Sequence, residues 1–298
     1  MHRDFFCGVG FALVLLAAPL GAWEVPALTT PATGERLAGK IVWADLFASD
    51  PPAAVKFYTG LFGWTAETIG AGPESYVVLR NGDQPVAGIA RRASKSGQSP
   101  WARWVLYASV EDVAGTVARA KARDGRVLLP AQEFAGRGVQ AVLADAQRAV
   151  IGIVRSRSGD PPDFQAEVGE WNWATLFARD PVTAGKFYAE VAGYEVVPDE
   201  RTERTNDFVL VSGGYARASI QPLPDRPGAK PAWLGFVRVA DVERSAARAT
   251  DLGGRILRGP KEPAEGARLR IAIVADPLGA AVGLVELLPL DEAAEDAP

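Results

Sequence analysis

Apolar and polar positions along the chain alternate with two periods, one typical of strands and one typical of helices. The apolar run at residues 41–48 predicts a strand, and Asp50 can cap a helix that starts at Pro51 and ends at Gly63. Asp112 likewise opens an Ala-rich helical segment that extends to residue 123. Further strands are predicted over residues 75–80, 85–91, 103–110, 127–129, 139–144 and 150–154.

This order of elements predicts an α+β fold. One strand, one helix and three strands make a βαβββ module, and two modules make a domain. Because each module has a single helix, helices are expected on one face of a curved mixed sheet, which leaves the other face concave. We call this concave face the cup, since a small ligand can bind there.

The chain contains an internal repeat with an offset of about 130 residues. WADLFASDP at residues 43–51 corresponds to WATLFARDP at 173–181, and Lys-Phe-Tyr follows at 56–58 and at 186–188. Later matches keep the same order: VEDV with VADV, GRVL with GRIL, and Asp145 with Asp276. A period of this length indicates a duplicated domain rather than a solenoid unit.

The repeat divides the chain into two tandem domains, at residues 39–156 and 169–288. The polar segment at residues 157–168 contains Pro and Gly and is expected to link the two domains. The acidic tail at residues 289–298 is expected to fray.

The first 22 residues have the layout of a secretory signal peptide. Arg3 precedes an apolar run, and small residues then lead to a predicted cleavage after Ala22. An uncleaved membrane anchor is the alternative, but the run is short for a spanning helix. Cleavage would place the protein in the periplasm or outside the cell, without membrane contact, and would remove His2 and Cys7, the only histidine and cysteine.

The charge composition bears on which macromolecules the protein can be expected to bind. The chain has a formal net charge of −4 and 23% charged residues, which is ordinary for a globular protein. With no basic patch in the sequence, we expect no nucleic-acid partner.

The ordered motifs of each repeat resemble the vicinal oxygen chelate superfamily. They are a strand, Asp-Pro, Lys-Phe-Tyr, Gly followed by an aromatic residue, a V-x-D-V helix start and a D-x-x-x-A-x-x-G run. The superfamily includes glyoxalase I, extradiol dioxygenases, fosfomycin-modifying enzymes and bleomycin resistance proteins. The resemblance covers both repeats and implies its fold, with a divalent metal usually held by His and Glu or Gln on cup-facing strands.

The resemblance also shows where these metal ligands would fall. The positions are Trp43, Gly88, Val105 and Gly152 in the first repeat, and Trp173, Ser219, Leu234 and Gly283 in the second. None offers an imidazole or a carboxylate, so we expect no metal and no catalytic residue there. The sequence also lacks a Gly-rich phosphate-binding loop, and we expect no other cofactor.

Aromatic side chains and glycines at these positions predict an aromatic-walled pocket for a small aromatic or apolar molecule. Strand alternation places neighbouring side chains on the same face. The predicted ligand-binding residues are Trp43, Asp45, Gly88, Val105, Tyr107 and Gly152 in the first domain, and Trp173, Thr175, Ser219, Leu234, Phe236 and Gly283 in the second.

Alternative interpretations of these residues remain open. Trp43 and Trp173 can instead fill the cups as core, and the glycines can mark bulges or close sheet contacts. Asp45 can be a hydrogen-bonded strand residue or a general base. Trp104 and Trp233 have the opposite strand parity and are expected to pack under the helices.

The leading functional hypothesis is a metal-independent binding protein for a small molecule. One alternative is a lyase or dioxygenase-like oxidoreductase with non-standard ligands, and another is an interaction protein whose cups are filled. The sequence leaves open whether each repeat builds its own cup, and whether the protein is a monomeric intrachain pseudo-dimer or a homodimer.

Overall fold

The computed structural model describes residues 25–72, 75–94, 99–202, 204–225, 228–260 and 268–288. The predicted signal peptide and the acidic tail lie outside the described residues.

The first domain contains two consecutive βαβββ modules. The first module is β1 (Ile41–Ala48), α1 (Pro51–Phe62), β2 (Thr65–Ile69), β3 (Tyr76–Asn81) and β4 (Gln84–Arg91). The second module is β5 (Ala102–Ser109), α2 (Val113–Ala122), β6 (Arg126–Phe134), β7 (Gly138–Ala144) and β8 (Val150–Ser156).

The second domain repeats this order. Its first module is β9 (Trp171–Ala178), α3 (Pro181–Ala192), β10 (Glu195–Pro198), β11 (Phe208–Ser212) and β12 (Tyr215–Pro222). Its second module is β13 (Ala232–Arg238), α4 (Val242–Asp251), β14 (Arg255–Arg258), β15 (Leu269–Ala275) and β16 (Ala281–Leu287). The predicted α+β class and the tandem modules are confirmed.

Each domain forms its own mixed sheet, which answers the question of how the modules pair. The first sheet has the order β2-β3-β4-β1-β5-β8-β7-β6, and the second has the order β10-β11-β12-β9-β13-β16-β15-β14. In both sheets the first strands of the two modules pair antiparallel at the centre, and each pairs in parallel with the last strand of its own module. The two halves of a sheet are therefore related by an approximate two-fold axis.

The residues predicted to begin and end the first helix of each domain cap these helices as expected. The side chain of Asp50 accepts a hydrogen bond from the backbone N–H of Ala53, and Asp180 does the same for Thr183. The same two helices end at glycines in the left-handed conformation, with φ of 73° at Gly63. These caps fix the angle at which each helix returns to its sheet.

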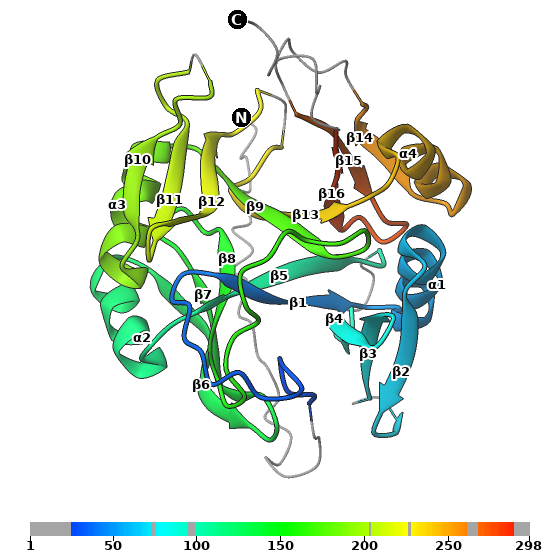
Figure 1. Ribbon diagram of the computed structural model, residues 1–298, viewed down its shortest axis with the longest axis horizontal. Helices are drawn as coiled ribbons and strands as arrows, with labels where there is room; N and C mark the ends of the chain where they lie inside the picture. The colour runs from blue at the N-terminus through cyan, green and yellow to red at the C-terminus, as the bar shows by residue number, and fades with distance from the viewer. Residues whose placement is uncertain are drawn as a thin grey trace, which may run out of the picture.

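The helix-bearing faces of the two sheets pack against each other. Leu46 and Phe57 of the first domain and Leu176 and Phe187 of the second belong to one buried cluster. Helix α1 lies beside α4, and α2 lies beside α3 on the opposite side of the strands (Figure 1). Both cups therefore face away from the contact between the domains.

Two reciprocal hydrogen bonds cross the interface between the domains. Tyr58 of α1 donates to Oδ2 of Asp276 over 3.1 Å, and Tyr188 of α3 donates to Oδ2 of Asp145 over 3.2 Å. Trp104 donates to the Tyr58 hydroxyl over 2.8 Å, so it packs beneath the helix as its strand parity predicts. Burial raises the pKa of both tyrosines and of both aspartates.

Residues 25–38, which we call the N-terminal strap, cross the first domain and bind the segment between the domains. Asp160 of that segment is fully buried, and its Oδ2 accepts hydrogen bonds from Ser109 Oγ at 2.6 Å and from the Leu37 N–H at 2.7 Å. Thr33 Oγ1 donates to the Asp160 carbonyl over 2.9 Å. The segment at residues 157–170 contains no helix or strand, yet it is packed against both the strap and β5.

Candidate functional site

The twelve predicted positions gather on the central strands as two sets of six, one in each cup. In the first domain the strand pairs are Asp45 with Gly88 and Val105, and Tyr107 with Trp43 and Gly152. In the second domain they are Thr175 with Ser219 and Leu234, and Phe236 with Trp173 and Gly283. The structure thus brings together the members of each set.

Neither cup offers a suitable donor set at the superfamily's metal positions. Asp45 is the one carboxylate of the first set, and its Oδ1 already accepts hydrogen bonds from Trp43 Nε1 at 2.8 Å and Tyr76 Oη at 2.6 Å. Across the described residues, no three His, Cys, Asp or Glu side chains form a group that could hold a metal ion. The side chains present therefore do not fit the superfamily's metal.

Aromatic rings fill the floor of the first cup. A β-carbon at Gly152 would lie 2.2 Å from Cδ1 of Tyr107, and one at Gly88 would lie 1.7 Å from Oη of Tyr76. Both glycines therefore make room for a tyrosine ring. Burial and the nearby charge of Asp45 raise the pKa of both tyrosines well above the usual value, so both hydroxyls stay protonated.

Arg137 and the N-terminal strap close the first cup from above. Arg137 is fully buried, and its Cζ lies 3.8 Å from the centre of the Trp43 ring, where a planar ligand would stack. Its Nε donates to the carbonyl of Pro26 over 2.8 Å, while Nη2 has no hydrogen-bond partner within the described part of the chain. Val25 and Leu28 of the strap join the buried clusters of this cup. In this domain the chain's own side chains occupy the cup.

The second cup has a different floor. Trp173 Nε1 donates to Ser219 Oγ over 3.1 Å, and Ser219 Oγ lies 2.9 Å from Oγ1 of Thr175. Thr175 and Ser219 stand where the first cup has Asp45 and Gly88. In the second cup, two hydroxyl groups thus replace the carboxylate of Asp45 and the glycine at position 88.

The apolar wall of the second cup is only partly covered. Leu234, Phe236 and Val285 are buried, whereas the side chains around them are partly exposed; these are Trp173, Phe177, Ile271, Ile273, Ala281 and Leu287. Leu269 at the rim is 44% exposed. Of the two cups, the second presents more apolar surface.

The strand register explains part of this difference. Val142 pairs with Gly152, and Ile273 pairs with Gly283, so Arg268 is the equivalent of Arg137. Arg137 is fully buried over Trp43, whereas Arg268 is exposed. The second cup therefore lacks the guanidinium that covers the first.

A different arginine lies near the second indole. Arg201 forms an ion pair with Asp199 through two hydrogen bonds, Nε to Oδ1 at 2.7 Å and Nη2 to Oδ2 at 2.9 Å. These bonds lower the pKa of Asp199. The Cζ of Arg201 is 6.0 Å from the centre of the Trp173 ring, and its side chain is 67% exposed. It borders the ring at a greater distance than Arg137 borders Trp43.

A cavity of about 620 Å³ lies where the two domains, the strap and the interdomain segment meet. Trp43 and Trp173 both line it. Three of its charged groups are already paired, because Asp163 Oδ1 lies 3.0 Å from Lys40 Nζ and 2.7 Å from Arg217 Nη1. This cavity therefore borders the edges of both cups, at Trp43 and at Trp173.

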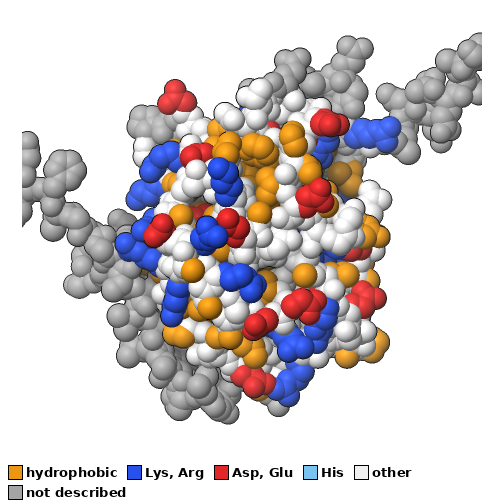
Figure 2. Space-filling view, turned by 90° about the vertical axis from the view of Figure 1, so that its left-hand side faces the viewer, with side chains coloured by type: hydrophobic (Ala, Val, Ile, Leu, Met, Phe, Trp, Pro, Cys, Tyr) orange, Lys and Arg blue, Asp and Glu red, His pale blue; other side chains and the backbone are white. Residues whose placement is uncertain are grey.

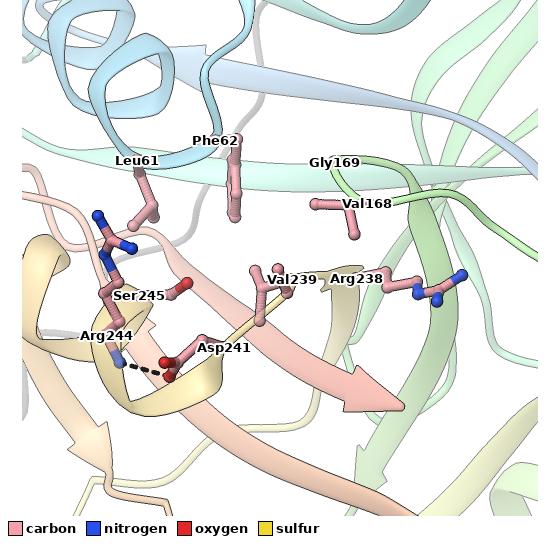
Figure 3. A pocket seen from close by; sticks show the side chains of 10 residues that line it. Leu61, Phe62, Val168, Gly169, Arg238, Val239, Asp241, Arg244 and Ser245 are labelled. Carbon is pink, nitrogen blue, oxygen red and sulfur yellow. Dashed lines mark hydrogen bonds between the residues drawn. The ribbon is translucent and has the colours of Figure 1, made fainter. Parts of the chain in front are cut away.

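A smaller cavity of about 230 Å³ separates the end of α1 from the start of α4 (Figure 3). Two of its polar side chains make structural contacts: Asp241 caps α4 through the N–H of Arg244 at 2.8 Å, and Arg238 donates to the carbonyl of Ala166 over 2.6 Å. This cavity lies at the interface between the domains and offers a ligand few free polar groups.

Surface charge and helix length bear on possible contacts with nucleic acids and membranes. On the face that carries α2 and α3, basic and acidic side chains are intermixed, without a continuous patch of one sign (Figure 2). Among the described residues, none of the helices has the length and apolar character needed to span a bilayer.

Sequence reasoning missed three residues that shape the first cup: Leu28, Tyr76 and Arg137. Tyr76 could have been found from its strand position two residues before the partner of Gly88. Leu28 and Arg137 carried no signal, since the strap has no periodic pattern and Arg137 lies in a turn.

Comparisons with known families match both halves of the chain. Residues 40–149 match the "Glyoxalase/Bleomycin resistance protein/Dioxygenase superfamily". Residues 173–285 match the "Glyoxalase-like domain".

Curated relatives align along nearly their full length. "Putative glyoxylase CFP32" from Mycobacterium tuberculosis is 28% identical over 262 residues, covering 87% of this chain and 99% of the relative. "Anthracycline biosynthesis protein DnrV" from Streptomyces peucetius is 28% identical over 264 residues, covering 84% of this chain and 94% of the relative.

Solved structures share the fold at lower sequence identity. The Mn(II)-bound glyoxalase from Novosphingobium aromaticivorans has a TM-score of 0.58 at 16% identity, covering 85% of this chain and 84% of that chain. The 2,3-dioxygenase LapB from Pseudomonas sp. KL28 has a TM-score of 0.56 at 13% identity, covering 87% of this chain and 96% of that chain.

Proposed function

Because the chain belongs to the vicinal oxygen chelate superfamily as a tandem two-domain member, we propose that it binds a small aromatic or apolar molecule without a metal. We assign this binding to the second cup. The observation that carries the proposal is the partly exposed apolar wall around Trp173, next to positions that lack metal-ligating side chains. The predicted signal peptide would deliver this activity outside the cytoplasm.

The relatives support the aromatic character of the ligand. One group of them is named for the biosynthesis of anthracyclines, which are polycyclic aromatic compounds. A flat ring can stack on Trp173, whereas Arg137 occupies the corresponding face of Trp43.

Calorimetric titration with 2-naphthylethanol, a neutral aromatic probe, tests the proposal. Trp173→Leu should lower the affinity by about tenfold or more, because the stacking surface is lost. Trp43→Leu is the matched control in the filled cup and should leave the affinity unchanged. An equal loss in both variants, or no binding by the unmodified protein, would refute this assignment.

The alternative function is a lyase or dioxygenase-like oxidoreductase with non-standard ligands. The relatives named glyoxylase and the structural neighbours named glyoxalase and dioxygenase favour it. Elemental analysis of the purified protein, with and without added Mn²⁺, Fe²⁺ or Zn²⁺, separates the two functions. One tightly bound metal per cup would overturn the metal-independent proposal.

A further inference from the structure

The two cups also differ at one position at the start of their third strands, β3 and β11. In the first domain Val78 pairs with Gly88, and Tyr76 is two residues before it. In the second domain Val209 pairs with Ser219, and Asp207 is two residues before that valine. Asp207 is thus the counterpart of Tyr76.

Strand alternation places the Asp207 side chain on the cup face. Phe208 and Leu210 pack into the core on the helix side of the sheet, so Asp207 and Val209 face the other way. The backbone ladder includes this residue, since the N–H of Asp199 donates to the carbonyl of Asp207 over 2.9 Å. Asp199 and Asp207 are therefore cross-strand neighbours on the same face.

The replacement of tyrosine by aspartate also accounts for the neighbouring residue. Tyr76 forces a glycine at position 88, because a β-carbon there would lie 1.7 Å from its hydroxyl oxygen. Asp207 is too short to fill that space, so Ser219 is tolerated at the equivalent position. Tyr76 spans its cup to reach Asp45, and no side chain of the second cup repeats that contact among the described residues.

The Asp207 carboxylate lies in an environment that is unusual for an acidic side chain. The residue is 1% exposed, and neither carboxylate oxygen has a hydrogen-bond partner among the described residues. Arg201 is bound through both its Nε and Nη2 to Asp199, the cross-strand neighbour of Asp207. Within the part of the chain that the structure describes, Asp199 is thus paired with a guanidinium and Asp207 is not, although a buried carboxylate without a partner is costly to fold. Costs of this kind are concentrated at functional sites, where a ligand supplies the missing partner.

We propose that the second cup recognises aromatic molecules that carry a positively charged nitrogen, with Asp207 as the residue that accepts its hydrogen bonds. The inference rests on the proposed function, because it names the class of ligand for the same cup. Trp173 provides the surface for the ring, and Arg201 with Asp199 forms the neutral pair at its edge. The first cup has Tyr76 at the equivalent position and has no such preference.

Three probes that share one ring test the charge preference: 2-naphthylethylamine, 2-naphthylethanol and 2-naphthylacetate. Calorimetric titration should show the amine binding about tenfold more tightly than the alcohol, with the acetate weakest. Asp207→Asn should remove the preference for the amine and leave the affinity for the alcohol within about twofold, since the ring contacts are unchanged. Asp207→Glu keeps the charge and should retain part of the preference.

The control is Asp112→Asn, which removes one exposed carboxylate that makes no side-chain capping bond in α2. It should leave all three affinities unchanged. Thermal melting of the ligand-free proteins gives an independent readout: Asp207→Asn should raise Tm, because it removes a buried charge without a partner, whereas Asp112→Asn should not.

The outcomes separate the two levels of the proposal. If the alcohol binds but the amine gains nothing, or if Asp207→Asn keeps the full preference, the role of Asp207 is refuted and the aromatic cup stands. If no probe binds, the proposed function fails, and the inference fails with it.

Discussion

A substitution of Gly88 tests how completely the first cup is filled. A β-carbon at this position would lie 1.7 Å from Oη of Tyr76 and 2.5 Å from Oδ1 of Asp45, so Gly88→Ala must displace the tyrosine. Overpacking of this kind costs about 1–3 kcal/mol. Loss of the 2.6 Å hydrogen bond between Tyr76 and the Asp45 carboxylate adds about 1.5–3 kcal/mol.

The clash should disappear when the tyrosine is removed. In a Tyr76→Ala background, adding Gly88→Ala should cost less than about 1 kcal/mol, since the new methyl group enters the space left by the ring. Thermal melting measures both steps, because Tm shifts by about 2–4 °C per kcal/mol in chains of comparable size. Gly88→Ala alone should therefore lower Tm by roughly 10 °C.

The matched control is Ser219→Ala, at the equivalent position of the second cup. It introduces no new β-carbon and removes only the hydroxyl contacts to Trp173 and Thr175, so its cost should be about 1–2 kcal/mol. If Gly88→Ala costs the same with and without Tyr76, the ring does not occupy that space and the reasoning is wrong.

Three further predictions concern the scaffold. Tyr58→Phe and Tyr188→Phe should each destabilise the protein by about 1–3 kcal/mol and by similar amounts, since each leaves a buried carboxylate of the other domain short of a donor; paired melting curves check this. Burial raises the pKa of five of the six tyrosines, so the unfolded chain loses its phenolic protons first as the pH rises. The contribution of these tyrosines to stability should therefore be complete below about pH 10 and fall above it, with tyrosinate absorbance at 295 nm appearing together with unfolding; a separate early rise from five phenols would contradict this. Asp50→Ala and Asp180→Ala should each lower stability by about 0.5–2 kcal/mol in thermal melts, because both carboxylates cap helices. Asp112→Ala should stay within about 0.5 kcal/mol, because it makes no side-chain cap bond.

The apolar pattern was sufficient to predict the modules and the central strands. The edge strand β2 had no individual signal, because its sequence TAETI is almost entirely exposed and shows no buried face. Strand β6 extends further than the predicted residues 127–129, through Pro130, which an edge strand tolerates. Predictions from apolar periodicity thus fail at sheet edges.

The cup positions were predictable, but their occupancy was not. The resemblance located Trp43 and Trp173 at equivalent positions, and the sequence alone predicted the same ligand-binding role for both. The difference comes from distant segments: Arg137 and the strap, as far as the structure describes them, cover Trp43 and leave Trp173 partly exposed. Such contacts depend on the tertiary path of the chain, which local patterns do not encode.

The reciprocal tyrosine–aspartate pairs have a consequence for how such a chain arises. Each half supplies one hydroxyl and one acid to its counterpart, so a single half is complementary to a copy of itself. A stand-alone ancestor with these residues would form an isologous dimer, and gene fusion would preserve the same bonds within one polypeptide. Once fused, the halves no longer had to remain identical, and one of them could lose its opening while the other kept it.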